Sequence, residues 1–432
     1  MGFLTRVLGS LLGGKKQAAP LAQEVSPGDH PPPAVVRPKV VISWQEMLDA
    51  SGAIAAYYLR QALLRSGQLP SGGELLRALE QAGIRQLAQR LRVIVPVRIE
   101  QWQQADFASL LAPNIHFLCQ YEPGLVAPEW HAWLAHVRQI GGRLAVDAVA
   151  YEHLPAGTGI SSMILLDAEQ MSVRLMAQWL AKLPPDHGVP VGVLGVATWA
   201  EQRYLNSLGV GLCQGPFSVV PDEAEQQESI SQSRMVLIEL LNRLRQDAEM
   251  ADLVAVVRRD PAVVMKLIEM ANSPLYGVGR QITGIEDAIM LLGRDALYRW
   301  IALALFRIDP QGKRDESLLV IALSRAAFLE KLAVAGNRRM AEELFLVGLF
   351  SVIDSLLRQP MAKVLAQVSL PPPVSAVLLQ QGGVYAHHLN LVQAMETCRI
   401  ELVLAIADLL GIDPAEILAA YADSMRWATL ET

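Results

Sequence analysis

Two aspartates stand where an α/β protein could place metal ligands. Asp147 ends the run 143–147 and Asp167 ends the run 163–167, and both runs are typical of short buried strands. Carboxylates at the ends of parallel strands can hold divalent cations, which polarise a water for hydrolysis. A carboxylate at a strand end can also cap the helix that follows it. Two carboxylates are too few for such a metal site, so we expect the capping role for both.

Other residue patterns that carry chemistry are missing from the sequence. Lys15 and Lys16 follow two glycines, but this stretch lacks the upstream glycine spacing and the preceding strand of a phosphate-binding loop. The chain holds neither a Gly-x-Ser-x-Gly nucleophile motif nor a zinc motif. Its three cysteines, Cys119, Cys213 and Cys398, are far apart, which indicates free thiols in a reducing cytosol. We therefore expect no cofactor and no metal, and a cytoplasmic location.

Length and composition favour a globular protein of two or three domains. The 432 residues are 52% hydrophobic and 19% charged, enough for sizeable cores. No run of about 18 apolar residues occurs, so we expect no transmembrane helix. A formal net charge of −6, with no compensating basic run, argues against a nucleic-acid partner.

The first 38 residues differ from the rest of the chain. Residues 1–15 place six apolar side chains on one helical face: Phe3, Leu4, Val7, Leu8, Leu11 and Leu12. This short amphipathic helix is interpreted as a docking or frayed terminal helix, with a weak peripheral membrane contact as the alternative. Residues 17–38 are rich in Pro and Ala, which predicts a disordered linker.

Between residues 39 and 221, short β-branched runs alternate with helical stretches. The strand candidates are residues 93–97, 115–119, 143–147, 163–167 and 189–194. Helical stretches such as 130–140 and 171–183 lie between them. The alternation predicts buried parallel strands joined by crossover helices, as in an α/β barrel.

From about residue 222 to the end of the chain the periodicity is helical. The clearest part is 253–306, which predicts three consecutive helices. Asp260 followed by Pro261 is typical of an N-cap and a first helical position. Thr283 and Glu286 have the spacing of a capping box, and Gly293 is expected to end that helix in the left-handed conformation.

This helical half resembles HDOD domains in four motifs that occur in the family's order. They are Asp-Pro at 260–261, Asn-Ser-Pro-Leu-Tyr-Gly at 272–277, Ile-Thr-Gly-Ile-Glu-Asp-Ala-Ile at 282–289 and Leu-Leu-Gly at 291–293. The resemblance implies an all-α relative of HD phosphohydrolases that has lost the metal ligands. It also implies a regulatory module that acts through protein–protein contacts.

Residues 39–221 resemble EAL domains, the fold of cyclic-di-GMP phosphodiesterases. The best-matched segments are Gly-Val-Ala-Thr-Trp-Ala-Glu-Gln at 195–202, Leu-Gly at 208–209, Gln-Gly-Pro-Phe-Ser at 214–218 and the stretch 138–147. The residues that carry the family's chemistry differ here. In the register of the resemblance, the expected metal-binding and catalytic positions hold Ala56, Pro96, a residue near Cys119, Asp147 with Ala148 in place of its neighbour, Leu165, Leu194 and Ala197. The resemblance thus implies a degenerate, TIM-barrel-like EAL domain without metal.

Two further predicted helices, 317–334 and 341–357, lie where catalytic HD domains carry a histidine and a His-Asp pair. This chain has Ala322 to Arg325 and Phe350-Ser351-Val352 at those places, and no histidine lies between His187 and His387. We therefore expect that the helical module assembles no HD metal site.

Together these features predict an α/β plus all-α chain: residues 1–38 as helix and linker, 39–221 as a degenerate EAL-like barrel, and 222–432 as an HDOD domain. The whole resembles EAL–HDOD two-domain signal-transduction proteins of the YuxH-like family. That resemblance implies a non-enzymatic bacterial scaffold with a regulatory protein partner, linked to cyclic-di-GMP signalling, and it leaves a homodimer open. The alternative is a cyclic-di-GMP receptor that does not hydrolyse its ligand, with Arg60 and Gln214 as candidates for nucleotide contact.

Overall fold

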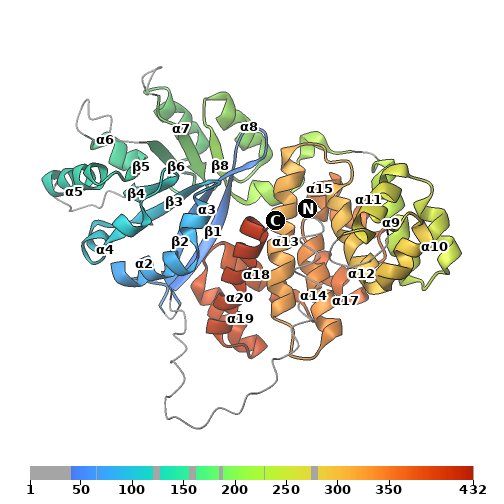
Figure 1. Cartoon of the computed structure of the whole chain (residues 1–432). Helices are drawn as coiled ribbons and strands as arrows, with labels where there is room; N and C mark the ends of the chain where they lie inside the picture. Colours follow the sequence, from blue (N-terminus) through green and yellow to red (C-terminus); the bar gives the residue numbers. More distant parts are fainter. Residues whose placement is uncertain are drawn as a thin grey trace, which may run out of the picture.

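A computed structural model describes residues 40–64, 66–119, 127–154, 162–183, 188–227, 229–273 and 281–431 (Figure 1). The expected N-terminal helix and linker lie outside the described residues, as do residues 274–277 of the Asn-Ser-Pro-Leu-Tyr-Gly motif. A strand-rich domain and a helical domain lie side by side, which confirms the expected α/β plus all-α class. Within the described part of the chain, no helix has the length and apolar character needed to cross a membrane.

Eight strands form a closed barrel in sequence order. The strands are β1 (Val40–Leu48), β2 (Ile54–Leu63), β3 (Arg92–Val97), β4 (Ile115–Cys119), β5 (Arg143–Asp147), β6 (Met163–Asp167), β7 (Val191–Leu194) and β8 (Leu212–Gln214). Strands β2 to β8 run parallel, as expected, but β1 is antiparallel to both of its neighbours. The cause is the tight turn between β1 and β2, where the Asp49 carboxylate accepts from the N–H groups of Ser51 and Ala53, and Gly52 has φ +81°.

The interior of the barrel is filled by apolar side chains. Because side chains alternate along a strand, one set points into the barrel and the other packs against the surrounding helices. The inner set consists of Met47, Ala56, Tyr58, Ile94, Leu118, Ala145, Met163, Leu165, Leu194 and Leu212, all of them buried. The barrel is therefore a packed core and not a pore.

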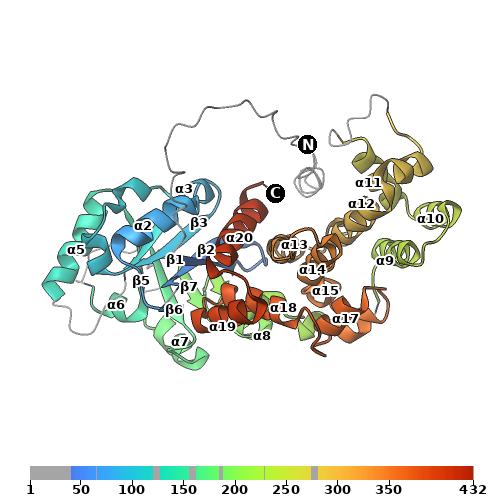
Figure 2. The same ribbon diagram turned by 90° about the horizontal axis from the view of Figure 1, so that it is seen from below.

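Helices surround the strands on the outside (Figure 2). They are α2 (Gly72–Gln81), α3 (Ile84–Leu87), α4 (Ile99–Gln103), α5 (Ala127–Gln139), α6 (Ala148–Glu152), α7 (Val173–Leu180) and α8 (Trp199–Ser207), with the 3₁₀ turns η2 (Phe107–Leu110), η3 (Pro216–Val219) and η4 (Glu223–Glu225). Aromatic rings fix this layer, since Trp102 lies 5.0 Å from Phe117 of β4 and 6.3 Å from Trp133 of α5, centroid to centroid.

The helical domain follows without a further strand among its described residues. Its helices are α9 (Gln232–Arg245), α10 (Met250–Val257), α11 (Pro261–Ala271), α12 (Ile285–Arg307), α13 (Lys313–Lys331), α14 (Arg338–Phe350), α15 (Ile353–Leu357), α16 (Met361–Leu365), α17 (Pro372–Leu378), α18 (Ala386–Glu396), α19 (Ile400–Leu410) and α20 (Pro414–Arg426), ending in the π turn η6 (Trp427–Glu431). Helices α13 and α14 approach so closely that a Cβ on Gly348 would lie 2.4 Å from the backbone nitrogen of Ala326.

Local signals in the helical half are confirmed in part. Asp260 caps α11 by accepting from the N–H groups of Ala262 and Val263. The prediction of a capping box at Thr283 and Glu286 is wrong, because α12 begins after Gly284, which has no side chain to cap it. Gly293 has φ +72° and interrupts the helix as expected, and a second helical stretch of α12 follows across the kink. The helix predicted over 341–357 divides near Ser351 into α14 and α15.

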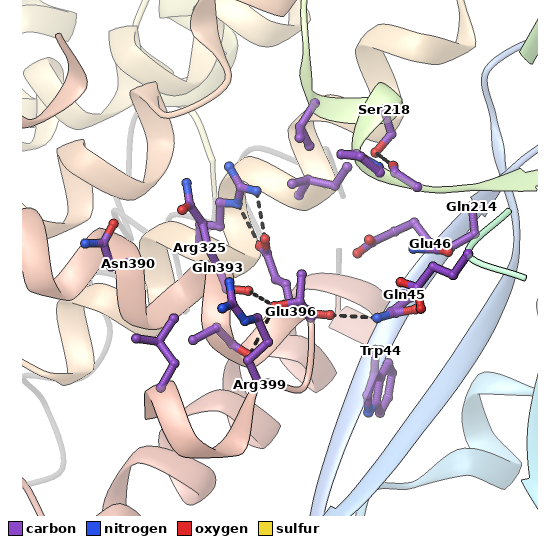
Figure 3. A pocket seen from close by; sticks show the side chains of 18 residues that line it. Trp44, Gln45, Glu46, Gln214, Ser218, Arg325, Asn390, Gln393, Glu396 and Arg399 are labelled. Carbon is purple, nitrogen blue, oxygen red and sulfur yellow. Dashed lines mark hydrogen bonds and ion pairs between the residues drawn. The ribbon is translucent and has the colours of Figure 1, made fainter. Parts of the chain in front are cut away.

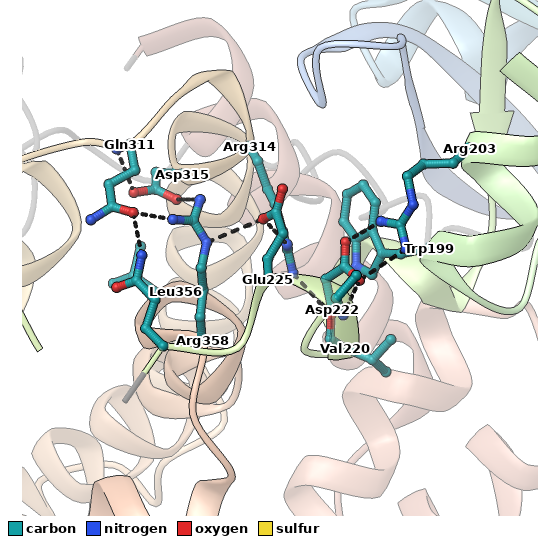
Figure 4. A network of polar contacts seen from close by, with 12 residues as sticks. Trp199, Arg203, Val220, Asp222, Glu225, Gln311, Arg314, Asp315, Leu356 and Arg358 are labelled. Carbon is teal, nitrogen blue, oxygen red and sulfur yellow. Dashed lines mark hydrogen bonds and ion pairs between the residues drawn. The ribbon is translucent and has the colours of Figure 1, made fainter. Parts of the chain in front are cut away.

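A network of charged side chains joins the two domains where the chain crosses between them (Figure 4). Glu225 of η4 pairs with Arg314 at 3.2 Å and with Arg358 at 3.3 Å. The Arg314 guanidinium also lies 4.1 Å from the centroid of a Trp199 ring and donates to the carbonyl of Val220. The crossing segment is therefore held by both domains.

Candidate functional site

The carboxyl ends of strands β2 to β8 meet at one end of the barrel, here called the mouth. In barrels of this kind, catalytic groups are supplied from the mouth. Three positions at which the sequence predicted the loss of a functional side chain, Ala56, Leu165 and Leu194, belong to the apolar interior cluster. None of these side chains carries an oxygen or nitrogen that could bind a cation.

Two further predicted positions lie on β3 and β4. Pro96 has no polar side chain, and its carbonyl accepts from the Gln61 amide at 2.6 Å. The sequence placed a glutamate position near Cys119, but that thiol points to the outer layer, where it donates to the carbonyl of Phe117. The neighbouring residue that faces the interior is Leu118, which is again apolar.

The two aspartates at the mouth cap the turns that follow their strands. Asp147 is the N-cap of α6 and accepts from the Ala150 N–H at 2.7 Å. Asp167 accepts from the N–H of Glu169 at 2.9 Å. Burial raises the pKa of Asp147, against the backbone hydrogen bonds that lower it. Among the residues that the structure describes, no three His, Cys, Asp or Glu side chains gather closely enough to hold a metal ion.

The two candidates for nucleotide contact are both engaged within the barrel. Arg60 Nη2 lies 3.7 Å from Glu169 Oε1. Gln214 Oε1 accepts from the N–H of Gly195 at 3.2 Å, which ties the end of β8 to the loop after β7.

Residues 396–399, between α18 and α19, lie over one side of the mouth and are here called the mouth turn. Ser43 Oγ of β1 donates to the carbonyl of Glu396 at 2.7 Å. Gln45 Nε2 of the same strand donates to that carbonyl at 2.9 Å (Figure 3). Cys398 in this turn has φ +56°, an unusual conformation for a residue other than glycine. The helical domain thus contacts the barrel at the side where a barrel of this kind would admit its ligand.

The mouth turn separates two cavities. The larger, about 740 Å³, lies between the barrel and helices α13, α18 and α19, and its lining includes Gln214 and Glu396. The smaller, about 260 Å³, includes Arg60 and Cys398. The two candidates for nucleotide contact therefore line different cavities, with residues of the helical domain in each wall.

A charged cluster occupies positions at which the sequence predicted the loss of HD metal ligands. Arg325 of α13 donates through Nε and Nη2 to the carboxylate of Glu396, at 2.7 and 2.8 Å, and through Nη1 to Ser351 Oγ at 3.0 Å. Arg325 and Ser351 are two of the residues that the sequence placed where a catalytic HD domain has histidines. Here Arg325 binds both Ser351 and the mouth turn.

Sequence reasoning missed Glu46, which lies beside this cluster in the larger cavity. Burial and the Glu396 carboxylate raise the pKa of Glu46 to about 7, although Arg325 acts in the opposite direction. The signal in the sequence is slight: one carboxylate within the otherwise mostly apolar stretch 40–48. Its partner Glu396 lies 350 positions further along the chain, which no local pattern reveals.

Comparison with known families assigns the second domain. Residues 229–368 match the HDOD domain, so the C-terminal part of the chain carries an HDOD domain. With the closed eight-stranded barrel before it, this match confirms the expected pairing of an EAL-like barrel with an HDOD domain.

Two curated relatives match over 235 residues each. The "Uncharacterized protein YuxH" of Bacillus subtilis is 27% identical, over 54% of this chain and 57% of the relative. The "Cyclic di-GMP phosphodiesterase CdgJ" of Vibrio cholerae is 25% identical, over 54% of each. The chain spans about half the length of the curated relatives it matches.

Solved structures similar to the first domain include an EAL domain protein from Listeria monocytogenes and the PaMucR phosphodiesterase in complex with c-di-GMP. The first is 15% identical, covering 42% of this chain and 87% of that one, with a TM-score of 0.34. The second is 16% identical, covering 41% and 94%, with a TM-score of 0.30. Scores this low carry no argument about function.

Proposed function

We propose that this protein is a non-enzymatic signalling scaffold of the EAL–HDOD type, which acts through protein–protein contacts in cyclic-di-GMP-linked regulation in the cytoplasm of a bacterium. The link to cyclic di-GMP is supported by the name of the relative CdgJ and by the segments that resemble EAL domains. The expected partner is a regulatory protein and not a nucleic acid. A homodimer and a weak membrane contact of the N-terminal segment remain part of the same proposal.

The observation that carries the proposal is the chemistry of the barrel mouth. Hydrolysis of a phosphodiester by bound cations needs several carboxylate or amide oxygens that converge on the metals. Here the inward positions are Ala56, Leu118, Leu165 and Leu194, and the remaining aspartates are used as caps. We infer that such a barrel keeps its packed core but no longer binds the metal ions.

The helical domain supports the same conclusion from its own residues. Arg325 at a predicted HD position would repel a divalent cation, and all three of its donor nitrogens already bind Glu396 or Ser351. A guanidinium is always charged at physiological pH and cannot serve as a metal ligand. The residues of both domains thus favour a role in protein binding over a role in catalysis.

The experiment is calorimetric titration of the whole chain with cyclic di-GMP, with and without Mg²⁺, followed by chromatography to look for cleavage. The scaffold proposal predicts no cleavage and no binding at tens of micromolar. Cleavage of the dinucleotide would refute it. Binding without cleavage would instead favour the receptor function.

Variants separate the receptor outcome from adventitious binding. Arg60→Ala and Gln214→Ala would then each weaken the titration, whereas Arg174→Ala would not. Arg174 lies on the outer helix α7 and lines neither cavity at the mouth. Binding that Arg174→Ala weakens equally would reflect surface charge alone.

A further inference from the structure

The larger cavity between the domains combines apolar walls with a polar floor. Its volume is about 740 Å³, and its apolar side chains are Trp44, Pro216, Val219, Ile321, Ala394 and Leu402. The polar floor is formed by Gln45 and Glu46 of β1 and by Glu396 of the mouth turn (Figure 3). Strand β1 pairs with β8 at Met47 and Leu48, so the stretch that carries these floor residues runs past the end of β8 along the cavity wall.

One hydrogen-bond acceptor on this floor lacks a donor in the described part of the chain. Gln45 is only 6% exposed, and its Nε2 donates to the carbonyl of Glu396, but its Oε1 has no hydrogen-bond partner among the described residues. A buried polar atom without a partner costs free energy comparable to a lost hydrogen bond. The next residue, Glu46, places a carboxylate beside the same cavity.

Three carboxylates, those of Glu46, Glu169 and Glu396, and two guanidiniums, those of Arg325 and Arg399, line the cavity. The groups that face Glu46 are Glu396 at the end of α18, Arg325 of α13, Tyr57 of β2 and Tyr421 of α20. Arg325 is engaged with Glu396 and Ser351, and burial raises the pKa of both tyrosines well above 10, so they are neutral. Burial, with the neighbouring Glu396 carboxylate as the second cause, raises the pKa of Glu46 to about 7.

We propose that this cavity binds a small organic cation, an ammonium or guanidinium group on a short aliphatic chain. The cationic group donates to the Glu46 carboxylate and to Gln45 Oε1, and the methylene groups lie against apolar side chains such as Trp44 and Leu402. A divalent metal ion fits less well, since the described residues bring no third carboxylate, cysteine or histidine into range. Because both domains line the cavity, the bound cation stabilises their docked arrangement. This inference is independent of the proposed function.

The test uses 1,4-diaminobutane as the probe and 1,4-butanediol as its neutral counterpart of similar shape, in calorimetric titrations of the whole chain. The variant Glu46→Gln removes the charge at the floor. Glu100→Gln is the control, because Glu100 is an exposed carboxylate of α4 in the same domain, outside the cavity. We expect the diamine to bind the wild type and the Glu100→Gln variant equally, and the Glu46→Gln variant at least tenfold more weakly.

The pH profile of the wild type gives a second readout that needs no variant. The cation competes with the proton on Glu46, so affinity for the diamine rises about tenfold between pH 6 and pH 8. The proposal is overturned if the diamine fails to bind in the millimolar range, if the diol or Mg²⁺ binds as well as the diamine, or if Glu46→Gln or a change of pH leaves the affinity unaltered.

Discussion

Asp315 gives the sharpest test of how the helical domain is held together. Its carboxylate is 1% exposed and accepts from Arg234 Nη2 at 2.8 Å and from the N–H of Gln311 at 3.0 Å (Figure 4). A second guanidinium, that of Arg358, lies 3.9 Å from the other carboxylate oxygen. The side chains of Arg234 and Arg358 are only 3% and 10% exposed, so water cannot replace the lost charge.

The substitution Asp315→Asn keeps the shape of the side chain and removes the charge. Loss of one partner from a buried ion pair typically costs about 3–5 kcal/mol, because the other charge is left buried and unpaired. With a urea m-value of roughly 2–3 kcal/mol/M, the unfolding midpoint falls by about 1 M or more. Circular dichroism at the helical minimum measures that midpoint.

The neighbouring residue provides a matched control. Glu316 pairs with Lys313 at 3.0 Å, but its side chain is 62% exposed. An exposed pair of this kind contributes at most about 0.5 kcal/mol, so Glu316→Gln leaves the midpoint nearly unchanged. If Asp315→Asn cost no more than Glu316→Gln, the reasoning about the buried network would be wrong.

Three further changes have expected results. Gly348→Ala drives a Cβ against the backbone of Ala326 and lowers the free energy of unfolding, measured in urea, by about 1–3 kcal/mol. The control is Gly73→Ala, in a helix with open space around it, which raises the free energy of unfolding by about 0.5–1 kcal/mol. Equal effects of the two substitutions would contradict the close crossing of α13 and α14. Asp260→Ala removes the cap of α11 and costs about 1–2 kcal/mol by the same assay, and a neutral result would mean that water replaces the cap. The pKa of Glu46 is about 7 in the folded protein and near 4.5 when exposed, so the wild type loses stability as the pH rises between these values. In thermal melting, Glu46→Gln is therefore more stable than the wild type at pH 8 and equally stable near pH 4. Parallel pH profiles of the two proteins would refute this.

The order of strands and helices could be predicted because their signals are local. Runs such as 143–147 are short and apolar and end at a capping residue, and Asp260 before Pro261 marks a helix start within two positions. Strands β1, β2 and β8 were not among the candidates drawn from the β-branched pattern. Strand β1 carries Gln45 and Glu46 within its apolar pattern, and β8 has only three residues.

The cavity between the domains could not be predicted from sequence. Its floor joins Gln45 and Glu46 to Glu396, and the contact between them depends on how two separately packed domains dock. Arg325 was predicted to stand where a catalytic HD domain has a metal ligand, but its binding to Glu396 followed only from the three-dimensional structure. Contacts between charged residues that lie far apart in the sequence produce no periodic pattern along the chain, so the sequence does not predict them.

The mouth turn belongs to residues beyond 368, where the match to the HDOD family ends. The helices α18 and α20, which pack beside β1, also come after that position (Figure 1). These last helices therefore connect the HDOD core to the barrel of this chain. Because α17, α18 and α20 also pack against α13 and α14, removal of the residues after 368 would expose apolar surface of the HDOD core as well as break its contact with the barrel.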